Sequence, residues 1–126
     1  MPAVIEAAKL GSKAAKVGFD WPDTAGIVAK VEEEVEELRA EIEHPSGVDR
    51  TRAEEELGDL MFSVVHLARH LKVDAEGALR AANAKFRSRF AAMEAEAGGF
   101  DALGGLSLER LEELWQRAKM AREVKA

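Results

Sequence analysis

The sequence predicts an all-α protein, and three observations carry that prediction. Ala, Glu, Leu, Arg and Lys, which favour helices, are abundant, whereas tyrosine is absent and runs of β-branched residues are few. Apolar residues recur at alternating spacings of three and four over long segments. Glycine and proline separate these segments. The chain of 126 residues fits one domain, residues 1–126, that can bury about two thirds of the surface its unfolded chain exposes.

The first two predicted helices occupy the N-terminal third of the chain. The first runs from about residue 2 to about residue 16, and Gly18 is its expected stop. The second begins near Asp23 or Thr24 as its N-cap and ends before Pro45. Its apolar stripe consists of Val28, Val31, Val35, Leu38 and Ile42.

Three further helices are predicted after the loop that contains Pro45. In the third, Thr51 and Glu54 resemble a capping box, and its apolar face consists of Leu57, Leu60, Met61, Val64, Ala68 and Leu71. The fourth has Asp74 as its possible cap and ends at Gly98 and Gly99. Its apolar side consists of Leu79, Ala82, Phe86, Phe90 and Met93.

The predicted last helix follows residues 100–105, a segment that we expect to be mobile because of its composition. Ser107 is the expected N-cap of this fifth helix. Its apolar side consists of Leu108, Leu111, Leu114, Trp115 and Ala118.

Composition and charge exclude several classes of function. The chain has no cysteine, which excludes disulfides, thiolate metal sites and a cysteine nucleophile. It has no apolar run of about 18 residues, and Glu6 and Lys9 interrupt any signal peptide, so we expect a cytoplasmic protein outside the membrane. The net charge of −6 argues against a nucleic-acid partner. A phosphate ligand would therefore be held by metal ions and a few placed cations.

Two acidic pairs on separate predicted helices form a candidate metal site. Glu34 and Glu37 are three residues apart, as are Glu56 and Asp59, and this spacing puts each pair on one helix face. Both pairs flank an apolar stripe, so antiparallel neighbouring helices would bring four carboxylates together. Two carboxylates about 6 Å apart repel by roughly 3 kcal/mol at an effective dielectric near 20. Such a cage favours Mg²⁺ first and Mn²⁺ second. The alternative is a solvated acidic helix face, on which each like-charged pair costs little.

Two cationic pairs are candidate contacts for a phosphorylated ligand. Lys85 and Arg89, four residues apart, can clamp phosphate oxygens, and their alternative is a pair of solvated cations. Trp115 and Lys119 have the same spacing and can stack on a base and touch a phosphate. The alternative there is a core tryptophan beside an exposed lysine.

Other side chains give weaker signals. Trp21 lies in a proline-containing loop and either binds a ligand or plugs the end of the helical bundle. His66 and His70 receive no role. Glu41 and His44 form one Glu-x-x-His motif, but a di-iron site needs a second copy, and His44 stands directly before a proline. The chain has no Walker-type phosphate loop.

Several motifs follow one another in a characteristic order: Val17–Pro22, Lys30–Glu34, Glu54–Phe62, Leu67–Leu71 and Asn83–Phe86, followed by Trp115 and Lys119. With these motifs the chain resembles the MazG-type nucleoside triphosphate pyrophosphohydrolases, an all-α family related to dimeric dUTPases. The resemblance covers nearly the whole chain. It implies that Mg²⁺ is bound by Glu34, Glu37, Glu56 and Asp59, with Glu33 as a carboxylate that orients water. It also implies that the nucleotide is held by Lys85, Arg89, Trp115 and Lys119.

The resemblance further implies an activity and an assembly. We expect hydrolysis of a nucleoside triphosphate to the monophosphate and pyrophosphate, by a homodimer whose helices form tandem four-helix bundles. Two-domain members of the family carry two copies of the acidic signature, and this chain has one, which matches the C-terminal copy. Either a natural one-domain protein or an excised domain fits this pattern. The alternatives are a dUTPase-like or phosphoribosyl-ATP-pyrophosphohydrolase-like enzyme and a nucleotide-binding helical module without turnover.

Overall fold

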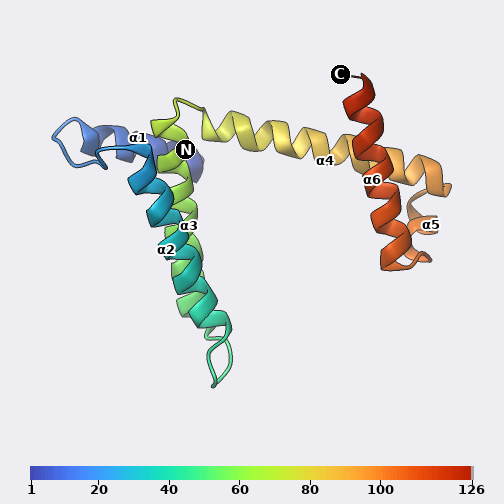
Figure 1. The fold of residues 1–126 in the computed structure, drawn as a ribbon, viewed down its shortest axis with the longest axis horizontal. Helices are drawn as coiled ribbons and strands as arrows, with labels where there is room; N and C mark the ends of the chain where they lie inside the picture. Colours follow the sequence, from blue (N-terminus) through green and yellow to red (C-terminus); the bar gives the residue numbers. More distant parts are fainter. Residues whose placement is uncertain (126) are drawn as a thin grey trace. The chain divides into compact units, whose positions relative to one another are not determined.

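The structure is a computed structural model that describes the backbone of residues 1–125 and the side chains of residues 1–121. Within this range it is all-helical and contains no strand, as predicted (Figure 1). The helices are α1 (Ala3–Ala15), α2 (Thr24–Ile42), α3 (Arg50–His70), α4 (Ala75–Ala97), α5 (Phe100–Gly104) and α6 (Leu108–Lys125). None of the helices in the described chain is both long and apolar enough to cross a membrane.

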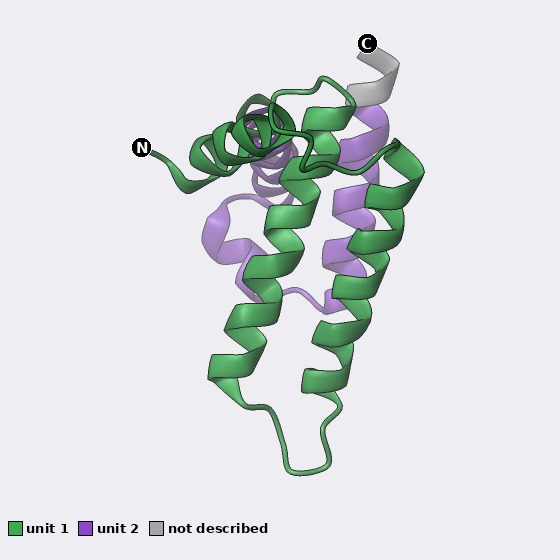
Figure 2. Cartoon of the chain, turned by 90° about the vertical axis from the view of Figure 1, so that its left-hand side faces the viewer, with its two compact units in different colours: residues 1–78 green, residues 79–126 purple. Residues whose placement is uncertain are grey.

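The chain divides into two compact units, Met1–Ala78 and Leu79–Ala126, with the boundary inside α4 (Figure 2). In the first unit, α2 and α3 form an antiparallel hairpin, and α1 packs against α3 at the end where α2 begins (Figures 1 and 2). Ile27 and Val65 are buried here. A Cβ atom at Gly11 would lie 2.5 Å from Cε1 of His66, so glycine is what allows α1 to approach α3 this closely.

The hairpin helices begin at aspartate caps. Asp23 caps α2 by accepting a hydrogen bond of 2.8 Å from the backbone N–H of the third helical residue, as predicted. The capping box predicted for α3 at Thr51 and Glu54 is wrong. Asp49 caps this helix instead, because its carboxylate accepts hydrogen bonds from the backbone N–H groups of Thr51 and Arg52 at 3.0 and 3.3 Å.

One apolar face of the hairpin stays open in the single chain. Its members are 37% to 55% exposed, although the periodicity predicted them as packed stripes. This face consists of Val28, Val35 and Ile42 on α2 and of Leu57, Met61, Val64 and Leu71 on α3. Large exposed apolar areas typically mark an interaction surface.

The second unit has its own core. Met93, Leu103, Leu114 and Ala118 form this core, and Phe90, Ala97, Leu106, Leu111 and Trp115 pack around it. Ser107 caps α6 through a hydrogen bond of 3.1 Å from the backbone N–H of Arg110, as predicted. The segment predicted to be mobile forms α5 instead, because Leu103 is only 6% exposed and anchors it to the core.

Candidate functional site

Helices α2 and α3 bring three of the predicted ligands together. Glu34, Glu56 and Asp59 each offer a carboxylate oxygen, and these atoms all lie within 4.8 Å of one another. Glu34 is only 4% exposed. Oε2 of Glu34 and Oε2 of Glu56 are buried and have no hydrogen-bond partner. A buried carboxylate oxygen without a partner is costly, and a bound cation would satisfy it.

The fourth predicted ligand, Glu37, lies beside this group. Its carboxyl group shares a hydrogen bond with Glu56, and this bond, followed by desolvation and the charge of Glu34, raises the pKa of Glu37 from 4.5 to about 7. The four predicted acids therefore form one cluster in which negative charge is crowded enough to retain a proton. We call Glu34, Glu37, Glu56 and Asp59 the acidic cluster.

Lys30 of α2 forms ion pairs with two glutamates of the same helix, Glu33 and Glu34. Its Nζ is 3.1 Å from Oε1 of Glu34 and 3.5 Å from Oε2 of Glu33. The hydrogen bond with Glu34 raises the pKa of Lys30 above its usual value. Glu33 is more exposed than Glu34 and faces this ammonium group. Sequence reasoning did not single out Lys30, although its spacing of three and four to the glutamates was the available signal.

The chemistry of the donor set fits a hard divalent cation. The acidic cluster offers only carboxylate oxygens, which magnesium, manganese and calcium ions prefer, whereas zinc sites in proteins commonly include histidine or cysteine. Two of these oxygens are buried and unpartnered, which supplies a reason for a cation to bind. The cluster can therefore hold a metal ion.

The predicted nucleotide contacts lie in the second unit. Cζ of Arg89 stands 5.3 Å from the ring centroid of Trp115, a cation–π contact, and the Phe86 ring lies 5.4 Å from the same ring. Lys85 and Lys119 are exposed. The structure thus brings Arg89 and Trp115 together and leaves the two lysines open to solvent.

A network around Asp20 connects the loop before α2 to the end of α3. The Asp20 carboxylate accepts hydrogen bonds of 2.8 and 3.2 Å from the Arg69 guanidinium and lies 2.8 Å from Nε2 of His70. Arg69, and after it His70, lower the pKa of Asp20 well below its usual range. Sequence reasoning assigned His70 no role and missed this network, although Asp20 and Arg69 both lie in motifs of the family signature.

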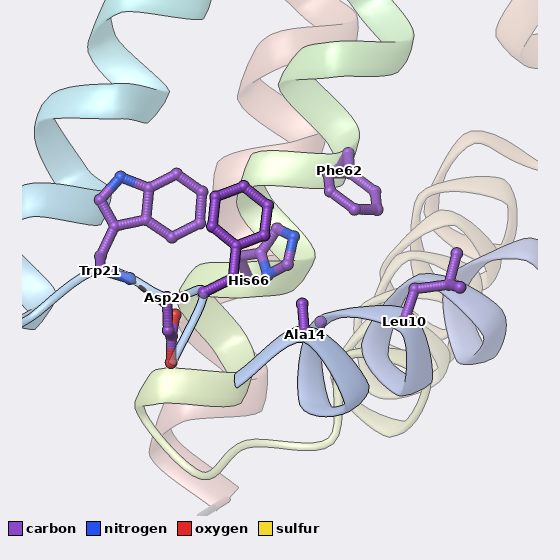
Figure 3. A pocket seen from close by; sticks show the side chains of 8 residues that line it. Leu10, Ala14, Asp20, Trp21, Phe62 and His66 are labelled. Atoms are coloured by element: carbon purple, nitrogen blue, oxygen red, sulfur yellow. Dashed lines mark hydrogen bonds between the residues drawn. The ribbon is translucent and has the colours of Figure 1, made fainter. Parts of the chain in front are cut away.

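A cavity of about 380 Å³ lies next to this network, where α1, the following loop and α3 meet. Helix α1 contributes Leu10 and Ala14, the loop contributes Trp21, and α3 contributes Phe62 and His66 (Figure 3). Gly11, Phe19 and Asp20 complete the lining. The Phe62 ring meets the His66 ring edge-on at 4.3 Å, and the Trp21 ring lies 5.3 Å from it. We call this space the aromatic cavity.

Comparisons with known proteins identify relatives of this chain. Over 121 residues the chain is 44% identical to the "Nucleoside triphosphate pyrophosphohydrolase" of Escherichia coli (strain K12). It is equally similar to the "Nucleoside triphosphate pyrophosphohydrolase/pyrophosphatase MazG" of Thermotoga maritima. Each alignment covers 94% of this chain and 45% of the relative, so the chain spans about half the length of these curated relatives. A shorter match, 43% identical over 66 residues, covers 51% of this chain and 13% of the "Uncharacterized protein YabN" of Bacillus subtilis.

A family model identifies the same region. The model of the MazG nucleotide pyrophosphohydrolase domain matches residues 23–93, which is more than half of the chain. The match includes both helices of the hairpin and every member of the acidic cluster. The chain therefore belongs to the MazG nucleotide pyrophosphohydrolase domain family.

Proposed function

We propose that this chain catalyses the Mg²⁺-dependent hydrolysis of ribo- and deoxyribonucleoside triphosphates to the monophosphate and pyrophosphate, as part of nucleotide-pool housekeeping in the cytoplasm. The observation that carries the proposal is the acidic cluster, with two buried carboxylate oxygens that lack a partner. Family membership and the printed names of the two relatives support the same reaction.

The acidic cluster would hold the cation. Glu34, Glu56 and Asp59 already place oxygens near one another, and Glu37 would join them on losing the proton that it shares with Glu56. When bound, Mg²⁺ would neutralise charge on the phosphate oxygens and make the attacking water more acidic, and Mn²⁺ is the expected substitute.

Glu33 is the proposed acceptor of the water proton. It is exposed, outside the crowded cluster, and its Oε2 contacts Lys30 at 3.5 Å. The water oxygen would form a bond to the α- or β-phosphorus, and the bond from that phosphorus to the bridging α–β oxygen would break. The other phosphate group would leave with the bridging oxygen. The products are the same for both attacks, and only the position of the water oxygen differs.

The second unit supplies candidate phosphate contacts. We propose that Lys85, Arg89 and Lys119 bind phosphate oxygens, because all three are cations at positions that match the nucleotide contacts of the family. Trp115 holds the Arg89 guanidinium over its ring and is proposed to orient it. Stacking of Trp115 on the base, the role expected from the sequence, stays a prediction.

A homodimer is part of the proposal. The open apolar face of the hairpin, with members that are 37% to 55% exposed, is the kind of surface that a second copy would cover. Two hairpins packed through this face would make a four-helix bundle.

The first experiment is pyrophosphate release from the eight common ribo- and deoxyribonucleoside triphosphates and from dUTP and phosphoribosyl-ATP, with Mg²⁺ and with EDTA. The wild type should release pyrophosphate only with metal, and Asp59→Asn should remove the activity. Glu36→Gln is the matched control, because Glu36 is an exposed carboxylate of α2 paired with Arg39 outside the cluster. Equal activity of Asp59→Asn and the wild type would refute the site. Triphosphate binding without cleavage would favour a binding module, and cleavage of dUTP or phosphoribosyl-ATP alone would favour the other related enzymes.

A further inference from the structure

The aromatic cavity and the acidic cluster lie along the same side of one helix. Asp59, Phe62 and His66 stand at positions i, i+3 and i+7 of α3, a spacing that keeps them on one face. At 1.5 Å per residue, Phe62 and His66 lie about 4.5 and 10.5 Å beyond Asp59 along the helix axis. A nucleotide whose phosphates lie at the acidic cluster can therefore extend its base towards the cavity.

The lining of the cavity suits a flat heterocycle. Phe19, Trp21 and Phe62 offer aromatic rings, and every nucleobase has a π-face on which such rings stack. The volume of about 380 Å³ is in the range of small-molecule sites. Phe19 is 81% exposed, so packing within the protein does not explain an aromatic residue there.

The cavity wall is fixed before a ligand arrives. Asp20 stands between Phe19 and Trp21 in the chain, and its carboxylate is bonded to Arg69 and His70 of α3. These contacts anchor the loop that carries both aromatic residues. A site whose wall is already ordered loses less conformational entropy when it binds.

The buried His66 adds one polar group. Nη2 of Arg69 lies 3.3 Å from Nδ1 of His66, and because a guanidinium can only donate, Nδ1 must accept. Burial, and after it the Arg69 charge, lower the pKa of His66, which favours the neutral ring. The ring proton is then on Nε2, where it can be donated to a carbonyl oxygen or ring nitrogen of a base.

We propose that the aromatic cavity is the base subsite of this protein, with Phe19 and Trp21 stacking on the nucleobase and His66 contacting its edge. This inference rests on the proposed function for the remainder of the nucleotide. Trp115 is the competing stacking residue, but its ring already carries Arg89 over one face and meets Phe86.

The two tryptophans of the chain make a direct test possible. Tryptophan fluorescence is the readout. In the Trp115→Phe variant only Trp21 fluoresces, and in the Trp21→Phe variant only Trp115 fluoresces. Adenosine, guanosine, cytidine and uridine would be titrated in EDTA, since nucleosides without phosphates do not require the acidic cluster. We expect at least one nucleoside to change Trp21 emission saturably and none to change Trp115 emission.

Phe19→Ala, made in the Trp115→Phe background, removes one of the two rings that we propose to stack on the base. It should weaken nucleoside binding about tenfold, in line with base–aromatic stacking. Val17→Ala is the matched control, because Val17 is 84% exposed, precedes the same loop segment and does not line the cavity. Its nucleoside affinity should equal that of the parent.

Kinetics distinguish this inference from the proposed function. Phe19→Ala should raise the KM for nucleoside triphosphates about tenfold while kcat stays close to the wild-type value. If the wild type releases no pyrophosphate, the proposed function fails and the nucleoside titration still tests the cavity. Absence of a saturable change at Trp21, a change at Trp115 alone, or equal affinities of Phe19→Ala and Val17→Ala would overturn the base subsite.

Discussion

Glu37 and Glu56, one on each helix of the hairpin, share a hydrogen bond between their carboxyl groups. Such a bond forms only while one of the two carboxyl groups is protonated. This contact raises the pKa of Glu37 to about 7, which places its titration within the physiological range. The hairpin therefore responds to pH at the point where we propose that a cation binds.

The stability of the protein in EDTA should depend on pH through Glu37. Its pKa is higher in the folded protein, about 7, than its ordinary value of 4.5, so the folded state binds more protons between these values. The contribution of Glu37 to the free energy of unfolding therefore falls as pH rises from about 4.5 to 7. Urea denaturation across pH 5 to 8 should show this fall as the difference between the wild type and Glu37→Gln. Parallel curves for the two proteins would contradict the shared proton.

Mg²⁺ should stabilise the protein more at pH 8 than at pH 6. A cation and a proton compete for the same carboxylates, so metal binding releases the proton of the Glu37–Glu56 pair. Thermal unfolding with 5 to 10 mM Mg²⁺ and with EDTA, at both values of pH, measures the shift in Tm on the order of a few degrees. Asp59→Asn should reduce the shift, and a shift independent of pH would show that the cation binds elsewhere.

Asp20→Asn should destabilise the protein most at neutral pH, and progressively less as pH falls below about 4. The pKa of Asp20 is lowered below its ordinary value of 3.8, so its ion pair contributes fully above about pH 4 and is lost as pH falls through the lowered value. Denaturation of both proteins at pH 7 and pH 3 measures the change. Arg69→Gln should have a similar effect, and the double variant should add little to it. Additive losses would mean that the two side chains act independently.

Gly11→Ala and Gly58→Ala should have opposite effects on stability. A Cβ at position 11 would lie 2.5 Å from Cε1 of His66, so α1 or the histidine must shift, at a cost of about 1–3 kcal/mol. A Cβ at position 58, inside α3, meets no atom within 4 Å, and alanine there should stabilise by up to about 1 kcal/mol. Urea denaturation in EDTA measures both changes. Equal effects would refute the close approach of α1 and α3.

Met61→Asp should convert the proposed dimer to a monomer. Met61 is in the open apolar face and is 54% exposed in the single chain, so a charge there would be buried only in the dimer. Light scattering after size-exclusion chromatography measures the mass of each protein. Val17→Asp, outside this face, should keep the wild-type mass. A monomeric wild type would refute the dimer itself.

The sequence predicts most of the hairpin because its signals are local. The N-cap at Asp23 and the three-residue spacing of both acidic pairs depend on residues close in the chain, and antiparallel neighbours then meet face to face. The cap of α3 was harder, because Asp49 and Thr51 are both good capping residues and only the backbone geometry selects between them. Leu103 anchors α5 through contacts with other helices, which a glycine-rich composition does not indicate.

The remaining contacts join residues far apart in the chain. Asp20 and Arg69 are 49 positions apart, and no period or motif spacing links them. Arg89 and Trp115 meet because α4 and α6 pack in the second unit, so the sequence alone left two possible roles open for each residue. Packing between elements, rather than local propensity, decides these positions.

Lys30 places a positive charge beside the acidic cluster before any metal ion binds. Its ammonium group and the proton shared by Glu37 and Glu56 offset part of the repulsion among the carboxylates of α2 and α3. The chain thus carries its own counter-ion, so the hairpin does not depend on a metal ion to offset all of this repulsion. Small zinc domains differ, because they fold only when they bind the ion. Under the proposed function, metal binding would activate a hairpin that has already folded.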